Sequence, residues 1–360
     1  MTFFDTIDWG RLPDVLRFER ESPMIFSSGL FLFCALLFLP LYMLLRRTTT
    51  LRIIYVSLFS LFFYYESSGE YVLILLFAAT MDFFIGRAIG RSEDEVYRKR
   101  LLITSICVNI GMLSYFKYFY FLLDLGQMLL ASLGIATEPA IPLEARDYFI
   151  PAGISFYTFQ TLSYTADIYR REITPLKRWI DYLFYLSFFP QLVAGPIVRA
   201  KDFIPQIYRR PQLLKAEYGE ALTLILSGLV KKAIIGDFIG ANLVDLIFAE
   251  PTRFTGLENL FAVYGYAMQI YCDFSGYSDM AIGIALLLGF RFNINFDSPY
   301  QSGNITEFWR RWHISLSTWL RDYLYIPLGG NRKGAIRTYV NLLVTMLLGG
   351  LWQQWHWSLY

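Results

Sequence analysis

Charged residues are scarce in this chain. They make up 17% of its 360 residues, against roughly a quarter of an ordinary soluble domain. Histidine occurs twice and cysteine three times. The cysteines stand singly inside apolar segments, in a spacing that fits neither a metal site nor a disulfide framework, so we expect no bound metal. The net charge of +2 lies in short clusters between apolar runs, which gives no reason to expect a nucleic-acid partner.

Apolar residues are abundant instead, at 55% of the chain. Uncharged runs near or above the roughly 18 residues that cross a bilayer occur repeatedly. Clear examples are residues 25–45, the shorter pair 51–65 and 71–85, and residues 101–123. The sequence therefore predicts an all-α polytopic membrane protein in contact with lipid. A loop is expected over residues 124–147, with further spans at 148–168, 222–248 and 339–352.

The loops between these runs alternate in charge. Basic clusters fall on alternate loops, and acidic ones on the others. The positive-inside rule then places the basic loops in the cytoplasm and the N-terminus outside. Residues 1–23 mix charges with aromatic residues, which fits a helix lying at the membrane surface or a partly ordered tail. Residues 24–360 are expected to form one transmembrane domain.

The most distinctive segment is NITEFWRRWHISLSTWLRDYLY, residues 304–325. Its spacing predicts one amphipathic helix with an apolar stripe and a polar stripe. The apolar stripe contains Phe308, Trp312, Leu316, Trp319 and Tyr323. The polar stripe contains Arg310, His313, Ser317 and Arg321. Cationic side chains are costly beside lipid, so this helix is expected to do chemistry or to bind an anion. A lone histidine is more often a structural donor than a catalyst, and both roles stay open for His313.

Two further segments combine apolar character with breaks and polar groups. FFPQLVAGPIVR, residues 188–199, contains Pro190, Gly195 and the polar residue Gln191. It is expected to be either a re-entrant wall that offers backbone amides to a substrate or a kinked span that ends in a basic residue. YCDFSGYSDMAIG, residues 271–283, is expected to break at Gly276. Its carboxylates, Asp273 and Asp279, would either position a polar substrate or pair with the arginines of residues 304–325.

Taken together, these segments resemble the membrane-bound O-acyltransferase family, in the bacterial branch of alginate O-acetyltransferases and teichoic-acid D-alanyl transferases. The stretches that carry the resemblance are residues 116–121, 150–170, 188–199, 271–300 and 308–332. The resemblance implies a ring of tilted helices with re-entrant segments around a central tunnel. A cytoplasmic acyl donor would enter this tunnel from one side and an acceptor hydroxyl from the other. It also implies a periplasmic partner protein.

The family has two marker histidines. His313 lies in WRRWHISLS and matches the first directly. The second, usually taken as catalytic, is expected after GLW, where this chain has Gln353. His356, three positions on, is a weak substitute. The family also continues through further spans that are absent here, so the resemblance implies a chain that is truncated or altered near its end.

The resemblance implies an O-acyltransferase that moves an acyl group, expected to be acetyl, to a hydroxyl of an exported polysaccharide or cell-envelope polymer. The donor would be an acyl-CoA or acyl-carrier thioester, used as a co-substrate rather than a bound cofactor. Arg310 and Arg321 would attract the donor's phosphates, and Ser317, Asp273, Asp279 and Gln191 would line the substrate path. Gln353 leaves alternatives open: an inactive relative, or a non-enzymatic transporter or scaffold. A lipid-modifying acyltransferase acting on a small alcohol is a third class.

Overall fold

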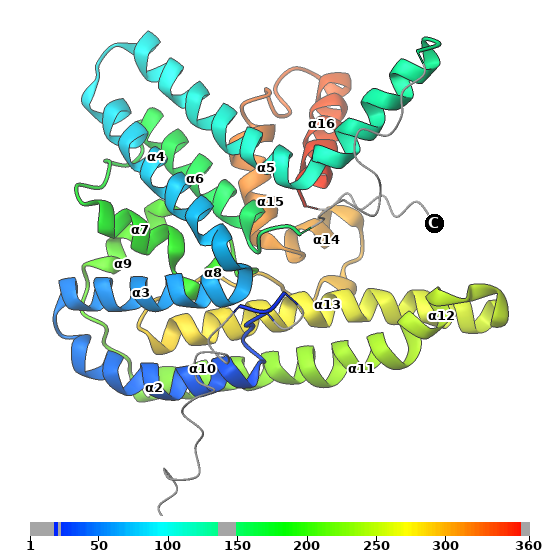
Figure 1. Cartoon of the computed structure of the whole chain (residues 1–360), viewed down its shortest axis with the longest axis horizontal. Helices are drawn as coiled ribbons and strands as arrows, with labels where there is room; N and C mark the ends of the chain where they lie inside the picture. The colour runs from blue at the N-terminus through cyan, green and yellow to red at the C-terminus, as the bar shows by residue number, and fades with distance from the viewer. Residues whose placement is uncertain (1–17, 21–22, 136–148, 354–360) are drawn as a thin grey trace, which may run out of the picture.

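The computed structural model describes residues 18–20, 23–135 and 149–353, and over these ranges the chain is helical without strands (Figure 1). The longer helices are α2 (Gly29–Leu45), α3 (Thr49–Ser68), α4 (Val72–Arg91), α5 (Glu95–Ser132), α6 (Ile154–Tyr169), α10 (Lys215–Leu229), α13 (Gly256–Leu287) and α16 (Ala335–Gln353). The shorter ones are α7 (Trp179–Ser187), α8 (Phe189–Leu192), α9 (Ala200–Ile207), α11 (Asp237–Ile239), α12 (Asp245–Ala249), α14 (Ile305–Arg311) and α15 (Ile314–Leu320).

Apolar surface is widespread on these helices. The stretch Thr49–Arg91 and helix α5 are long and apolar enough to cross a membrane, and α2 and Ala335–Leu351 are shorter apolar helices. Many large hydrophobic side chains on them are exposed, which suits contact with lipid rather than water. The stretches 51–65 and 71–85 form two helices, α3 and α4, as predicted, and these are separated at Gly69 (φ 58°).

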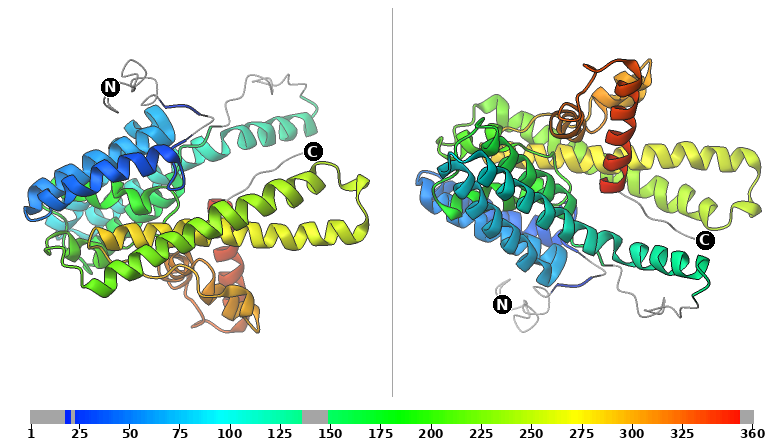
Figure 2. Two further views of the ribbon diagram at one scale, coloured as in Figure 1. Left: turned by 90° about the horizontal axis from the view of Figure 1, so that it is seen from below. Right: turned by 90° about the horizontal axis from the view of Figure 1, so that it is seen from above.

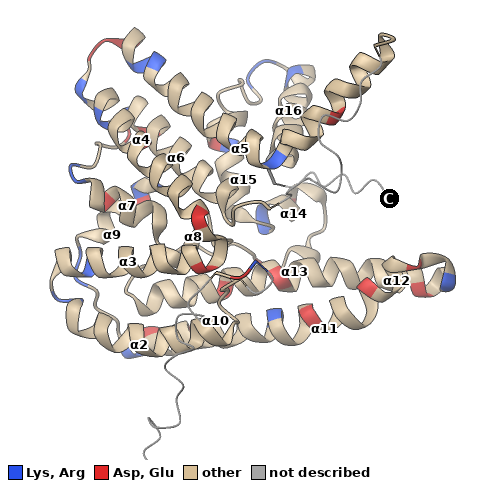
Figure 3. Cartoon of the chain, in the orientation of Figure 1, with Lys and Arg blue, Asp and Glu red and all other residues tan. Residues whose placement is uncertain are grey.

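The basic turns form one end of the helix bundle. Arg171, after α6, pairs with Glu93 of the α4–α5 turn at 2.7 Å. Arg178, before α7, pairs with Asp181 at 2.6 Å, and Tyr208, after α9, donates to the same carboxylate at 2.6 Å. Figure 3 shows Lys and Arg gathered mainly at turns and helix ends. These contacts bring loops that are distant in sequence onto one side, as the alternation of charge predicts.

Helices α10 to α13 form a long hairpin that projects from the rest of the chain (Figures 1 and 2). The predicted break at Gly276 is wrong, because α13 runs unbroken from Gly256 to Leu287. Gly276 serves close packing instead: a Cβ there would lie 2.7 Å from the carbonyl oxygen of Gly228 on α10. The first arm of the hairpin, from α10 to α12, contains two π-helical stretches, Val230–Gly236 and Gly240–Val244. Small residues at such an interface let two backbones approach closely.

The broken element predicted over residues 179–198 is confirmed. Helix α7 ends at Ser187, the single turn α8 follows, and the chain then runs without regular structure to Arg199. Nearly all of it is buried, including Gln191, whose amide donates to the carbonyl of Tyr185 at 2.5 Å. Non-helical backbone at membrane depth survives only where protein covers it, and this element meets that condition.

One expected boundary is wrong. The loop predicted over residues 124–147 starts later, because α5 continues through Asp124 to Ser132. An acidic residue ends a hydropathic run, but it does not end a helix by itself.

The first part of α5 is joined to α4 and α6 by a buried polar network around Asp82. Asp82 accepts from Ser105 at 2.5 Å and from Asn109 at 2.8 Å. Thr161 in turn donates to Asn109 at 3.2 Å.

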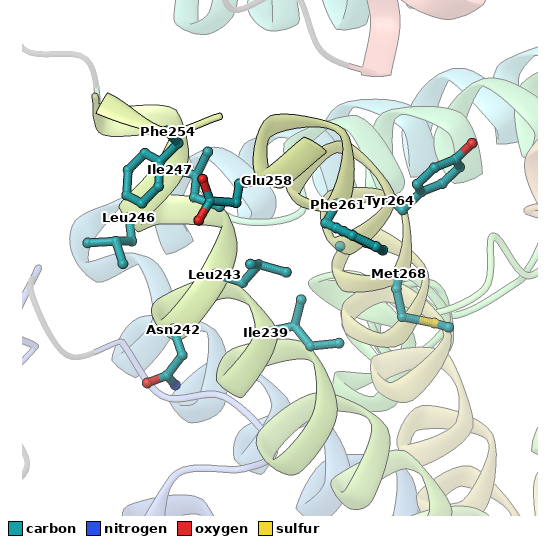
Figure 4. Close-up of a pocket in the computed structure, with 11 residues that line it drawn as sticks. Ile239, Asn242, Leu243, Leu246, Ile247, Phe254, Glu258, Phe261, Tyr264 and Met268 are labelled. Atoms are coloured by element: carbon teal, nitrogen blue, oxygen red, sulfur yellow. The ribbon is translucent and has the colours of Figure 1, made fainter. Parts of the chain in front are cut away.

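The tip of the α10–α13 hairpin holds an apolar cavity of about 640 Å³. Leu243, Leu246, Phe254, Phe261 and Tyr264 are among its lining residues (Figure 4). None of the residues predicted as site residues lines it.

Replacing Gly276 with alanine tests the close packing of the hairpin. The new methyl group would meet backbone atoms of Gly228 and Lys232 at 2.7 and 3.0 Å, so we expect Gly276→Ala to destabilise the protein by roughly 1–3 kcal/mol. Gly219→Ala on α10 is the matched control, because nothing lies within 4 Å of its Cβ. The control should be neutral or slightly stabilising. Thermal unfolding in detergent measures both, and equal midpoints would contradict the packing argument.

Candidate active site

The predicted single helix over residues 304–325 is wrong. It is broken at Trp312 and His313, which separate α14 from α15, and a π-helical turn, Arg321–Tyr325, follows α15. Trp312 is extended, and His313 has a φ of 42°, in the left-handed region. A non-glycine residue there costs on the order of 1–3 kcal/mol and persists only where its surroundings fix it, commonly at functional sites.

The break divides both predicted stripes. Phe308 and Trp312 pack against each other and against Tyr300, with ring centroids 5.5–6.2 Å apart. Leu316 and Trp319 instead pack on α6, where the Trp319 indole donates to the carbonyl of Phe159 at 3.0 Å. Among the polar residues, Arg310 and Arg321 are exposed, whereas His313 is only 1% exposed. The histidine is therefore separated from the arginines that share its sequence periodicity.

Asn295 fixes the backbone at the break. Its carbonyl accepts from the amide of Ile314 at 2.9 Å, and its side-chain oxygen accepts from the hydroxyl and the amide of Ser315 at 2.9 and 3.2 Å. Its amide group donates to Ser278 of α13 at 3.1 Å, and Ser315 accepts from the amide of Ile197 at 3.0 Å. The His313 turn is thereby tied to α13 and to the end of the broken element. Sequence reasoning missed Asn295, because nothing local marks an irregular segment as the anchor of a distant turn.

Aromatic rings surround the His313 imidazole. The ring of Phe274, on α13, lies edge-on at 4.6 Å between centroids. Phe156 of α6 and Phe296 lie at 6.3 Å, the latter nearly parallel to the imidazole. The imidazole thus lies inside the protein, where three separate segments meet, and faces neither lipid nor bulk water.

The carboxylates of α13 do not pair with arginines, which corrects one of the two predicted roles. Asp279 pairs with Lys231 at 2.6 Å, and Asp273 with Lys232 at 3.1 Å, so both stabilise the hairpin. Phe274, the residue after Asp273, packs on the imidazole instead. Successive residues of α13 therefore serve different neighbours. The sequence showed the need for a cationic partner but not which cation lies opposite.

A charged cluster at the end of α15 was also missed. Arg199 pairs with Asp322 at 2.6 Å, and Arg321 pairs with the same carboxylate at 2.6 Å. Tyr323 donates to Asp167 of α6 at 2.7 Å, beneath the guanidinium groups of Arg170 and Arg199. The cluster joins α6, the broken element and the π-helical turn. Its residues come from three separated segments, so no local pattern could identify it.

Ser317 and Gln191 have structural partners near this region. The Ser317 hydroxyl donates to the carbonyl of Trp312 at 3.3 Å, across the break, and Gln191 donates within the broken element. Neither residue contacts the His313 side chain through a hydrogen bond described in the structure. Their predicted substrate contacts stay predictions.

Comparison with known proteins identifies the family. Residues 171–360 match the membrane-bound O-acyltransferase family. The chain belongs to this family. It is 42% identical over 332 residues, 91% of its length, to the probable alginate O-acetylase AlgI of Pseudomonas aeruginosa. It is 41% identical over 93% of its length to the protein of the same name from Azotobacter vinelandii. A Helicobacter pylori peptidoglycan O-acetyltransferase is 32% identical over 96% of the chain.

The chain spans 62% and 66% of the lengths of the Pseudomonas aeruginosa and Azotobacter vinelandii relatives, and 70% of the Helicobacter pylori one. The resemblance drawn from motifs is thus confirmed. An all-helical architecture with several apolar helices agrees with a polytopic protein of this membrane-bound family. The matched region includes His313, Asn295 and the α10–α13 hairpin.

Helix α16 packs on the π-helical turn that follows α15. Asn341, early in α16, donates to the carbonyl of Gly330 at 2.8 Å, while a Cβ on Gly349 would lie 2.9 Å from the side chain of Leu320. Gln353, the last residue of α16, follows one turn later. The last turns of α16 therefore lie beside Leu320, at the C-terminal end of α15. His356 lies outside the described residues.

Asn295→Ala tests how the His313 turn is held. The variant leaves the part-buried amide and hydroxyl of Ser315 without their acceptor and removes the buried hydrogen bond to Ser278, so we expect a loss of stability of roughly 1–3 kcal/mol. Asn242→Ala is the matched control, because the Asn242 side chain makes an exposed hydrogen bond to its own helix. Thermal unfolding of purified protein measures both. A midpoint for Asn295→Ala equal to that of the control would show that this residue does not anchor the turn.

Proposed function

We propose that this chain is an O-acyltransferase that moves an acyl group, acetyl in the first instance, from a thioester donor to a hydroxyl of an exported polysaccharide or cell-envelope polymer. The observation that carries the proposal is the His313 turn: a strained, almost fully buried histidine, fixed by Asn295 and surrounded by aromatic rings. Relatives named as O-acetylases and O-acetyltransferases of alginate and peptidoglycan support the acyl group and the class of acceptor.

The reaction needs two things from the protein. The acceptor oxygen attacks the thioester carbonyl, a C–O bond forms, and the tetrahedral oxyanion then expels the thiolate as the C–S bond breaks. A base must take the hydroxyl proton, which finally passes to the thiolate, and donors must stabilise the oxyanion. In this proposal His313 orients or deprotonates the acceptor hydroxyl. Its buried position excludes water, which would otherwise hydrolyse the thioester.

The two substrates would reach His313 from opposite sides of the membrane, through a tunnel within a ring of tilted helices. His313 does not line the cavity at the tip of the hairpin, and the tunnel is inferred from membership of the family. The exposed Arg310 would attract the phosphates of a coenzyme A-type or carrier-bound donor on the basic, cytoplasmic side of the inner membrane. Arg321 would assist, although it shares the carboxylate of Asp322 with Arg199. A periplasmic protein would complete the transfer to the polymer.

A non-enzymatic role is the second candidate, and Gln353 favours it. Glutamine forms hydrogen bonds but cannot accept and release a proton near neutral pH as histidine does. Losing a general base alone typically lowers a rate by about 10²–10⁴-fold. The chain would then bind or pass a substrate without acylating it.

Acyl transfer by three forms of the chain separates these functions. The assay measures radiolabelled acetyl transfer from acetyl-CoA to alginate in membranes containing the chain itself, Gln353→His or His313→Ala. We expect Gln353→His to raise the rate by roughly 10²-fold or more and His313→Ala to lower it by 10²–10⁴-fold. Asn242→Ala, far out on the hairpin, is the control for expression and insertion. Full activity of His313→Ala would refute the site, and turnover by none of the forms would favour the non-enzymatic role.

A further inference from the structure

A second cavity lies on the basic side of the chain, away from His313. It has a volume of about 380 Å³ and is lined by Arg46, Arg47, Arg210, Pro211 and Gln212. Small-molecule sites typically start near 300 Å³. Arg46 and Arg47 close the turn after α2, whereas Arg210 comes from the segment between α9 and α10. The positive-inside rule accounts for arginines on this side, but not for their convergence on one cavity from segments far apart in sequence.

These three guanidinium groups lack carboxylate partners. Within the ranges that the structure describes, no acidic side chain forms an ion pair with Arg46, Arg47 or Arg210. Other arginines on the same side are neutralised, such as Arg178 by Asp181 and Arg291 by Glu217. A concave site with three uncompensated arginines attracts an anion, and guanidinium groups bind phosphate in bidentate geometry.

The wall that presents Arg210 is held rigidly. The fully buried Arg52 of α3 donates to the carbonyl of Arg209 at 3.0 Å and also to that of Ile207, at the end of α9. Gly289 has a φ of 82°, and a Cβ there would lie 2.5 Å from Pro211, so the backbone after α13 packs directly on this wall. Glu217 accepts from the amide of Leu214 at 2.6 Å and also pairs with Arg291. Contacts within the protein therefore fix the backbone that carries Arg210, which lowers the entropic cost of ordering this wall around a ligand.

The immediate surroundings of the arginines are apolar and exposed. Leu44, which precedes Arg46, is 76% exposed, and Leu41 and Leu51 are 43% and 49% exposed. Such side chains at the end of the apolar helix α2 offer contact to acyl chains, and arginines that directly follow an apolar helix are expected near the lipid headgroups. A soluble phosphate ester would use the arginines alone.

We propose that Arg46, Arg47 and Arg210 form a binding site for the phosphate of an anionic glycerophospholipid, with Leu41, Leu44 and Leu51 contacting its acyl chains. The site is independent of the proposed acyl transfer. Each arginine near an anionic headgroup adds to the electrostatic attraction, so three of them distinguish an anionic from a zwitterionic lipid. The bound lipid joins the α2–α3 turn to the α9–α10 segment.

Native mass spectrometry of the detergent-purified chain tests the site, with dioleoyl phosphatidylglycerol, dioleoyl phosphatidylcholine and inorganic pyrophosphate as probes. The pocket variant is Arg46→Gln/Arg47→Gln/Arg210→Gln. The matched control, Arg91→Gln/Lys99→Gln/Arg100→Gln, removes the same charge from exposed positions at the α4–α5 turn, none of which has a described ion pair. Thermal midpoints without added lipid establish that both variants fold.

We expect wild type and the control to bind phosphatidylglycerol alike, and the pocket variant to bind it at least roughly tenfold more weakly. Phosphatidylcholine should bind weakly to all three forms. Equal affinity of the pocket and control variants for phosphatidylglycerol would overturn the site. Pyrophosphate that binds wild type as tightly as phosphatidylglycerol, and displaces it, would overturn the lipid assignment in favour of a soluble phosphate ester. A variant Arg46→Lys/Arg47→Lys/Arg210→Lys keeps the charge but loses the bidentate guanidinium geometry, so it should bind phosphatidylglycerol more weakly than wild type and more tightly than the pocket variant.

Discussion

The structure depends on one constraint: backbone and polar side chains that leave regular helical hydrogen bonding inside an apolar protein must find partners within it. Two interruptions show how this is met. In the broken element, the side-chain amide of Gln191 donates a hydrogen bond to the carbonyl of Tyr185. At the His313 turn, Asn295 accepts hydrogen bonds from the amides of Ile314 and Ser315. Both interruptions lie deep in the chain, and Ser315 links them through the amide of Ile197.

This constraint explains why a histidine occupies the second break. Backbone strain at His313 is tolerated because α13, α6 and the segment around Asn295 hold it on several sides. The same contacts fix the direction of the imidazole and exclude water from it. An orientation of this kind suits acyl transfer, in which a hydroxyl must be aligned with a thioester before hydrolysis can compete.

The sequence predicted the membrane class, the paired helices α3 and α4 and the broken element, because apolar periodicity and proline act locally. It failed where distant contacts decide. Gly276 was read as a breaker, although it permits α13 to approach Gly228. The break at His313 was hidden by a perfect helical spacing, since periodicity describes side chains and not φ angles. The sequence predicts that Asp273 and Asp279 need cationic partners. It does not show that these partners are Lys231 and Lys232, because only the fold places the first arm of the hairpin beside α13.

Motif resemblance supplied what periodicity could not. It implies that Gln353 stands at the position where the family has its second marker histidine. Neither motif resemblance nor periodicity predicts the arginine cavity at the α2–α3 turn. Its residues are ordinary membrane-flanking arginines in the sequence, and only the rigid wall built by Arg52, Gly289 and Glu217 brings them together.

An electron cryomicroscopy structure with a non-hydrolysable acetyl thioester analogue tests the central claim most directly. The account predicts an interruption between α14 and α15, with the His313 side chain enclosed by Phe274 and Phe296 and the acetyl group of the analogue beside it. An unbroken helix through residues 308–320, or an imidazole directed into lipid with the analogue bound elsewhere, would contradict it.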